Sequence, residues 1–233
     1  MKTHGIIVSG VHSALDKIGL AKGIQQNARG KLSYKYLDPC LNVVKEQTDE
    51  YKTIGHIMNE IIIKERKGDY LGATVQITPH VTEEIRTWLV DTDADKTISV
   101  IGGNIGDMEN IVAIEAVREM TNKENNVKII MYAPVPYLKA PGELKTKPAQ
   151  HAVREAMRLG IQPDALCLFC DKELSESEMN KIELYTGVSK KNIVWHTNGV
   201  KECSKRLAKI IYGEAKEFES APWRHRPYIT APM

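Results

Sequence analysis

The sequence has no run of apolar residues long enough to cross a bilayer, which takes about 20 residues. Residues 1–8, MKTHGIIV, also lack the apolar core and the cleavage site of a secretory signal. We therefore expect a cytoplasmic protein with no membrane partner.

An excess of charge of either sign is also lacking. The chain has 32 basic and 30 acidic residues among 233, which leaves a formal net charge of +2. Proteins that bind nucleic acid usually carry a marked basic surface, so we expect no nucleic-acid partner. One short basic patch, Trp223-Arg224-His225-Arg226, lies close to the C-terminus. It could dock on a neighbouring molecule or be an ordinary ordered terminus.

Cysteine is scarce, and four residues are too few for a disulfide scaffold in a chain of this length. Cys167 and Cys170 have the spacing of a C-x-x-C motif, but they lie within the apolar run DALCLFC, which is typical of a buried strand. Residues three apart on a strand point to opposite faces. We therefore predict buried thiols and no metal site at this motif.

Short β-like runs alternate with amphipathic helical patterns, which indicates an α/β fold with a mainly parallel sheet. The stretch IVSGVHSALDKIG at 7–19 stands between the first strand and the first helix, where a phosphate-binding loop would lie. We predict a three-layer αβα, P-loop-like fold. The expected strands are 4–9, 33–37, 97–101, 128–134, 164–169 and 192–195. The expected helices are 13–28, 52–66, 82–90, 108–121, 148–159, 176–186 and 200–217.

Residues 1–217 are expected to form one domain and residues 218–233 a tail. The tail contains three prolines, which cannot continue the preceding helix. Ser175 and Glu178 have capping-box spacing at the start of the helix at 176–186, and Gly187 supplies its end.

Four polar or glycine-rich stretches follow predicted strands. Ligands of open α/β sheets gather beyond the carboxyl ends of the strands, so four such loops at one edge predict a binding site there. The loops are SGVHSALDKIG, LDPCLNV, GGNIGDMEN and PYLKAPGELKTKPAQH.

Several of these stretches closely resemble the amidoligase domain of CTP synthase. The most specific match is PYLKAPGELKTKPAQHAVRE at 136–155 with GIQPD at 160–164, and the likeness covers most of residues 4–200 in order. The other matching stretches are YLDPCLNV at 36–43, KGDYLGATVQITPH at 67–80, IGGNIGDMEN at 101–110 and NKIELYTGVSKKNIV at 180–194.

The resemblance implies a specific chemistry. Members of this family use ATP and Mg to phosphorylate O4 of UTP and then displace the phosphate with ammonia. The ammonia normally comes from a C-terminal glutamine amidotransferase domain, which this sequence does not contain. A working enzyme would therefore need free ammonia or a separate amine-donor protein. The family also assembles through this domain, so a homo-oligomer, a dimer or tetramer, is expected.

The residues that the family uses for the pyrimidine nucleotide are largely kept. The K-T-K-P-x-Q segment, which binds UTP or CTP across a subunit interface, is present at 145–150, and two lysines at a helix start suit a triphosphate. Acids of the G-D-x-E segment can accept hydrogen bonds from an exocyclic amine. By this resemblance the nucleotide-binding residues are Ser13, Asp107, Glu109, Lys145, Lys147, Gln150 and Lys181. The alternatives remain that the lysines are merely solvated and that Asp107 caps the helix at 108–121.

The residues that the family uses for ATP and Mg are largely replaced. An acid that holds Mg corresponds to Val100, and a long acidic stretch with a second such acid is mostly missing. Asp49 and Glu50 could substitute for it. A lysine implicated in phosphoryl transfer corresponds to Tyr36, with Lys35 on the opposite face of the strand, and an adenine-contacting arginine corresponds to Phe169.

The phosphate loop itself is kept only in part. Gly10 and Lys17 remain as its remnant, and Lys17 would be catalytic if activity survives. Ser9, Asp16 and Ile18 stand where the family has glycines. Glycines let backbone N–H groups close around a phosphate, whereas Asp16 adds a like charge that costs on the order of 4 kcal/mol at about 4 Å and an effective dielectric near 20.

Three hypotheses follow. In the first, the protein binds a pyrimidine nucleotide and has lost ATP- and Mg-dependent conversion of UTP to CTP. In the second, it is a working ligase that uses ammonia or another amine on UTP or a related carbonyl compound, with ATP and Mg as cofactors. In the third, it is a non-catalytic scaffold. We predict no metal site outside the second hypothesis.

Overall fold

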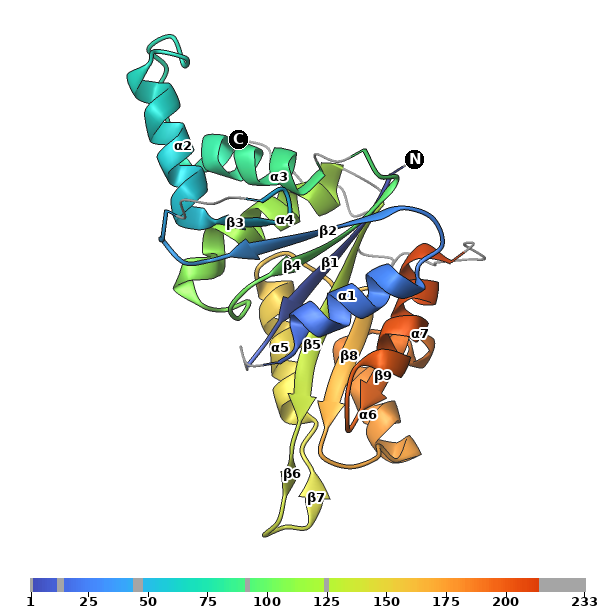
Figure 1. The fold of residues 1–233 in the computed structure, drawn as a ribbon. Helices are drawn as coiled ribbons and strands as arrows, with labels where there is room; N and C mark the ends of the chain where they lie inside the picture. Colours follow the sequence, from blue (N-terminus) through green and yellow to red (C-terminus); the bar gives the residue numbers. More distant parts are fainter. Residues whose placement is uncertain (1, 12–14, 44–47, 91–92, 124–125, 214–233) are drawn as a thin grey trace, which may run out of the picture.

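A seven-stranded parallel sheet forms the centre of the computed structural model, which describes residues 2–11, 15–43, 48–90, 93–123 and 126–213. The strand order is β3-β2-β4-β1-β5-β8-β9, and each neighbouring pair is parallel (Figure 1). The strands are β1 (Thr3–Ser9), β2 (Leu32–Asp38), β3 (Tyr51–Thr53), β4 (Lys96–Ile101), β5 (Val127–Val135), β8 (Ala165–Cys170) and β9 (Ile193–His196).

Helices cover both faces of this sheet. Helices α1 and α7 pack on one face, and α2 to α6 pack on the other, which confirms the predicted three-layer fold. The helices are α1 (Lys17–Asn27), α2 (Ile54–Arg66), α3 (Thr82–Val90), α4 (Ile111–Lys123), α5 (Lys147–Arg158), α6 (Glu176–Thr186) and α7 (Lys201–Tyr212). No helix in the described part of the chain has the length and apolar character that crossing a membrane requires.

The central strands are buried on both faces because helices cover both sides of the sheet. Successive side chains point to opposite faces, so they enter the two cores alternately. On β1, Ile6 and Val8 join the core under α2 to α6, while Ile7 joins the core under α1 and α7. The same alternation separates Cys170 from Cys167, as predicted. Cys167 instead lies against Cys203 of α7, and burial together with this contact raises the pKa of the Cys167 thiol.

The six predicted strands match to within one residue at each end, and the capping box of α6 is present with Gly187 in the left-handed conformation. Three short strands were missed: β3, and the hairpin of β6 (Tyr137–Leu138) and β7 (Glu143–Leu144). Elements of two or three residues carry too little periodicity to predict.

Three helix boundaries were wrong by three residues or more. The helix expected at 13–28 begins at Lys17, because Asp16 caps its N-terminus. The helix expected at 200–217 ends at Tyr212 with Gly213 as its C-cap. The proposed tail at 218–233 and residues 12–14 lie outside the described residues. Residues 108–110 form a 3₁₀ turn, η2 (Met108–Asn110), that leads into α4.

Candidate functional site

The loops that follow β1, β2 and β4 meet at one edge of the sheet, as expected for parallel strands. The amide of Ile105 donates to the carbonyl of Ser9 at 2.8 Å, and the amide of Gly102 donates to the carbonyl of Leu37 at 2.8 Å. The loop after β1 also contacts α5, because a Cβ on Gly10 would lie only 2.3 Å from the Cβ of Ala152. Gly10 therefore allows the loop to pack closely against α5.

Lys17 points inward rather than toward solvent. Its Nζ donates to the Ser9 hydroxyl at 2.8 Å and to the Gly103 carbonyl at 2.6 Å, and Lys17 as a whole is only 5% exposed. Burial lowers the pKa of Lys17 to about 8, while the nearby carboxylate of Asp107 opposes this shift. The amine thus joins the loop after β1 to the loop after β4.

Asp16 occupies the N-terminus of α1. Its Oδ1 accepts a hydrogen bond from the amide of Gly19 at 2.8 Å, and its backbone carbonyl accepts one from Leu20 at 3.0 Å. A Cβ on Gly19 would lie 2.1 Å from Oδ2 of Asp16, so the carboxylate covers this first turn closely. Amides at a helix start are what a phosphate loop offers to an anion. Here a side chain of the protein itself takes up one of them.

Two local features shape the loops next to Lys17: a strained backbone at Val11 and hydrogen bonds from Asn110. Val11, a β-branched residue, has a φ of 73°, a conformation that costs roughly 1–3 kcal/mol and is concentrated at functional sites. Within the segment that follows β4, the buried Asn110 amide donates to the carbonyls of Gly102 and Asn104, each at 2.7 Å. Sequence reasoning missed the roles of Ser9 and Asn110, although Ser9 was visible as a replaced glycine.

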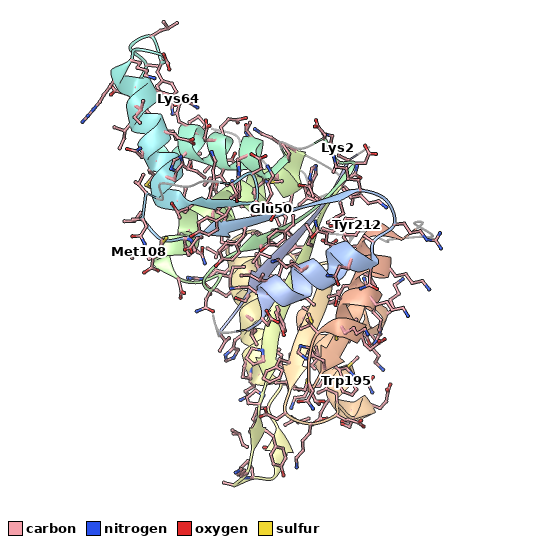
Figure 2. All side chains as sticks on the ribbon, in the orientation of Figure 1. Lys2, Glu50, Lys64, Met108, Trp195 and Tyr212 are labelled. Atoms are coloured by element: carbon pink, nitrogen blue, oxygen red, sulfur yellow. The ribbon has the colours of Figure 1, made fainter. Side chains whose placement is uncertain are left out.

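Asp107 and Glu109 are exposed on the loop that follows β4. Oδ2 of Asp107 accepts from the backbone and side-chain nitrogens of Asn104 at 3.2 and 3.0 Å. The alternative that Asp107 caps the following helix is wrong, because Asp107 stands at the N-cap of η2 without a side-chain capping bond. Met108 between them is 82% exposed and projects from the loop (Figure 2).

Lys145 and Lys147 flank the start of α5, beyond the β6–β7 hairpin that projects from the sheet edge (Figure 1). Lys147 is the first residue of α5 and is exposed, whereas Lys145 forms an ion pair with Glu143. Thr146 at the N-cap forms no side-chain capping bond, so no side chain in the described residues caps this helix start. Gln150 is buried and donates to the Thr146 hydroxyl at 3.0 Å, so it holds Thr146 in place.

Lys181 on α6 lies near the hairpin. Lys145 and, to a smaller extent, Lys181 lower the pKa of Glu143, which places both ammonium groups close to this carboxylate. The predicted residues therefore form two groups: Gly10, Lys17 and Asp107 at the meeting loops, and Lys145, Lys147 and Lys181 around the hairpin and α5. Ser13 lies outside the described residues.

The positions that correspond to the ATP and Mg ligands of the resemblance are filled by packed side chains. Val100 is fully buried in the core under α1 and α7. The Tyr36 ring stacks on Tyr51 at 5.7 Å between centroids, and burial raises the pKa of the Tyr36 hydroxyl. Lys35 points to the other face, as predicted, where its Nζ donates to the Trp88 carbonyl at 2.5 Å.

An aromatic cluster covers the ends of β8 and β9. The Phe169 ring lies 5.5 Å from the ring of His196, and the Tyr132 hydroxyl lies 2.8 Å from Nε2 of His196. Burial lowers the pKa of His196, and the charge of Asp16 opposes this shift. His196 therefore lies near Asp16, at the N-terminus of α1.

The acids that the sequence offered for a magnesium ion do not gather in one place among the described residues. Within the described residues, no three His, Cys, Asp or Glu side chains gather in a way that could hold a metal. Asp49 and Glu50, which could have supplied the missing acids, line a separate groove beside β2 together with Trp88. Lys17 and Asp107 do not border that groove.

Comparison with known proteins gives a consistent assignment. The family described as "CTP synthase N-terminus" matches residues 40–208. The CTP synthase of Sphingopyxis alaskensis is 46% identical over 171 residues, covering 72% of this chain and 31% of that protein. The CTP synthase of Rhodospirillum rubrum is 36% identical over 230 residues, covering 81% and 42%.

The CTP synthase of Aquifex aeolicus is 46% identical over 150 residues, covering 63% of this chain and 28% of that protein. This chain thus spans less than half the length of these curated relatives. Among solved structures, the signal recognition particle 54 kDa protein from Aeropyrum pernix in complex with GDP has a TM-score of 0.43 at 13% identity, covering 91% of this chain and 46% of that one. This likeness is too slight to add to the assignment.

Proposed function

Because this chain belongs to the CTP synthase N-terminus family, we propose that it binds a pyrimidine nucleoside triphosphate, UTP or CTP, and does not carry out ATP-dependent amination of UTP. One contrast between two helix starts supports the proposal. The N-terminus of α1 is taken up by Asp16, while that of α5 has no side-chain cap and carries Lys145 and Lys147 beside it. A triphosphate is favoured at the second site and disfavoured at the first.

The charges around α5 suit the anionic end of the ligand. Lys147 at the first position of α5 adds its charge to the positive end of the helix dipole, and Lys145 and Lys181 stand nearby on the hairpin and α6. The ion pair of Lys145 with Glu143 is exposed, so exchanging this partner for a phosphate costs little. The exposed carboxylates of Asp107 and Glu109 could accept hydrogen bonds from the exocyclic amine of cytosine.

The β6–β7 hairpin projects far enough to contact a second copy of the chain. The β6–β7 hairpin extends beyond the sheet edge, away from the loops that carry Asp107 and Glu109 (Figure 1). In the family that this chain resembles, the K-T-K-P-x-Q segment binds the nucleotide across a subunit interface, and here this segment directly follows the projecting hairpin. We therefore propose a homo-oligomer, a dimer or tetramer, as the binding form in the cytoplasm, with no nucleic-acid partner.

A second function, a working ligase, is favoured by one observation: Lys17 is retained, and its pKa of about 8 leaves a part of it as a neutral amine near physiological pH. Such an enzyme would use ATP and Mg, with ammonia or an amine from a separate donor protein. Replacement of the metal-ligand position by buried Val100 weighs against it, since metal neutralisation carries much of phosphoryl-transfer catalysis.

The test compares ligands and products. Thermal unfolding is measured with CTP, UTP and ATP, each with and without Mg, and ADP release is measured with UTP, ATP, Mg and ammonium. A ligand at 100 times its Kd stabilises the folded state by about 2.7 kcal/mol. We expect stabilisation by CTP or UTP, none by ATP, and no ADP release. ADP release that Lys17→Ala abolishes would establish the ligase, and no stabilisation by any nucleotide would leave a non-catalytic scaffold.

A further inference from the structure

Within the described residues, the first half of β2 has no neighbouring strand on one side. The amide of Tyr36 donates to the carbonyl of Glu50 on the β3 side at 2.7 Å, and the carbonyl of Leu37 accepts from Gly102 on the β4 side at 2.8 Å. Because peptide groups alternate along a strand, those of Tyr34 point away from β4 like those of Tyr36. The strand β3 pairs only with residues 36–38, so no strand in the described part of the chain pairs with Tyr34 on that side.

A groove of about 630 Å³ runs beside this open edge, with Trp88 of α3 in its wall. Three carboxylates, those of Asp49, Glu50 and Asp93, line it, and none of them takes part in an ion pair among the described residues. An exposed edge with free peptide groups is a template for another extended segment. The carboxylates favour a segment that carries positive charge.

Two of the lysines in the groove are already engaged. Lys35 donates to the Trp88 carbonyl at 2.5 Å, and Lys52 forms a 3.0 Å ion pair with Glu60. The ion pair neutralises Lys52, whereas Lys35 keeps its charge because a carbonyl is neutral. Lys31 and Lys35 therefore offset two of the three acids, and the described lining keeps one net negative charge. A basic, extended polypeptide is therefore the chemical class of partner that this groove fits.

The chain itself supplies such a segment close by. Helix α7 ends at Tyr212, whose hydroxyl donates to the carbonyl of Thr97 on β4, and Thr97 pairs with Ser33 on β2. Figure 2 labels both Tyr212 and Glu50, at the end of α7 and at the β2 edge. Neighbouring strands lie about 4.8 Å apart, so the open edge of β2 is within roughly 10 Å of Thr97.

Residues 214–233 follow this point, and 20 residues can span about 66 Å when extended. They contain the basic patch Trp223-Arg224-His225-Arg226 between Pro222 and Pro227. All four residues of the patch carry a backbone N–H, and in an extended chain the two arginines share one face while Trp223 and His225 share the other. The patch thus offers both the backbone donors and the positive charge that the groove lacks.

We propose that the C-terminal segment docks in this groove in the same chain, with the Trp223–Arg226 patch as a short added strand on β2. The peptide groups of Tyr34 then pair with the patch, and Arg224 and Arg226 meet the carboxylates of the groove. This interaction is separate from nucleotide binding at α5 and does not depend on it.

Hydrogen exchange of the full-length protein tests the proposal. The double variant Arg224→Glu, Arg226→Glu should exchange the Tyr34 amide at least about 10-fold faster than the wild type, while the amide of Ile7 in the central strand stays protected. The control Arg66→Glu, Arg154→Glu reverses two exposed arginines on α2 and α5 and should leave Tyr34 unchanged. Adding Asp49→Lys and Glu50→Lys to the tail variant should restore the protection.

Two outcomes would overturn the docking. Equal exchange of Tyr34 in the wild type and in the tail variant would mean that the patch does not cover the edge. Protection that disappears on 100-fold dilution would mean that a second copy, and not the same chain, occupies the groove.

Discussion

The ammonium group of Lys17 lies 2.6 Å from the carbonyl oxygen of Gly103, although 86 residues separate the two along the chain. The same ammonium donates to the Ser9 hydroxyl, which in turn donates to the Gly103 carbonyl at 2.8 Å. In this arrangement the ammonium group of Lys17 donates two hydrogen bonds to groups of the protein itself. These contacts give Lys17 a structural role that does not require catalysis.

The first prediction concerns the pH dependence that Lys17 causes. Its pKa is lowered from 10.5 to about 8 in the folded protein, so between these values the unfolded chain binds more protons. The free energy of unfolding should therefore rise as the pH increases from about 8 to 10.5, and it should lose this contribution below pH 8. The difference amounts to at most about 3 kcal/mol. Urea unfolding at a series of pH values measures it.

Lys17→Met is the reference for this measurement, because other groups titrate in the same range. In this variant no lysine titrates at position 17. Between pH 8 and 10.5, the free energy of unfolding should therefore rise more steeply for the wild type than for Lys17→Met, by at most about 3 kcal/mol over the whole range. Parallel curves for wild type and variant would contradict the lowered pKa.

The second prediction concerns Asp16. Asp16→Gly removes the carboxylate that covers the first turn of α1, so inorganic phosphate or ATP should then stabilise the variant against thermal unfolding. The free energy of unfolding without ligand should fall by about 0.3–1 kcal/mol because a cap is lost. Thermal shift with phosphate, ATP and ATP plus Mg is the measurement.

Ser175→Gly is the matched control, since it removes the side-chain cap of α6 in the same way. It should cost a similar free energy and bring no response to phosphate or ATP. If Asp16→Gly behaves like this control, Asp16 does not exclude the anion.

The third prediction concerns the lysines at α5. Lys147→Ala should weaken CTP or UTP binding about 10-fold, which corresponds to roughly 1.4 kcal/mol, and should reduce its dependence on salt. Lys145→Ala should weaken binding less, because Lys145 must first leave Glu143. Isothermal titration at two salt concentrations measures both effects.

Lys205→Ala provides the control, because Lys205 is exposed on α7 on the opposite face of the sheet. The affinity of this variant for CTP or UTP should equal that of the wild type. Equal affinities for Lys147→Ala and Lys205→Ala would remove α5 from the binding site.

The fourth prediction concerns the close packing of Gly10. Gly10→Ala places a methyl group 2.3 Å from the Cβ of Ala152, so the free energy of unfolding should fall by about 1–3 kcal/mol. Ala152→Gly alone should cost about 1 kcal/mol in the middle of α5. The double variant should be no less stable than Gly10→Ala, because the second change makes room for the first.

Urea unfolding of the four proteins gives the coupling free energy between the two sites. A coupling free energy near zero would contradict the prediction, because it would mean that the loop at Gly10 moves away from α5 without loss of stability.

Much of the fold could be predicted because its causes are local. The apolar runs at β1, β4, β5 and β8 are long enough to indicate buried strands, and Ser175, Glu178 and Gly187 bound α6 by capping interactions within the helix itself. The hairpin of β6 and β7 escaped prediction because two-residue strands show no periodicity.

The sequence predicted which loops form the candidate site. It did not predict which residues of these loops contact one another. Parallel strands place the loops after β1, β2 and β4 at one edge, so their meeting follows from strand order alone. The roles of Asp107 and Asp16 did not follow, because a carboxylate near a helix start can cap the helix, close a turn or face a ligand. Asp107 closes a turn with Asn104, and Asp16 caps α1.

By itself the sequence determined the order of strands and helices along the chain and the glycines and lysines available at the sheet edge. These follow from periodicity and residue chemistry, which act over a few neighbouring residues. Only the tertiary structure decided that Lys17 bonds to Gly103 and that Asp49 and Glu50 line a separate groove. It also decided that no strand among the described residues pairs with Tyr34 on the β3 side of β2. Each depends on chain segments far apart in sequence, and their distances are set by packing across the whole sheet.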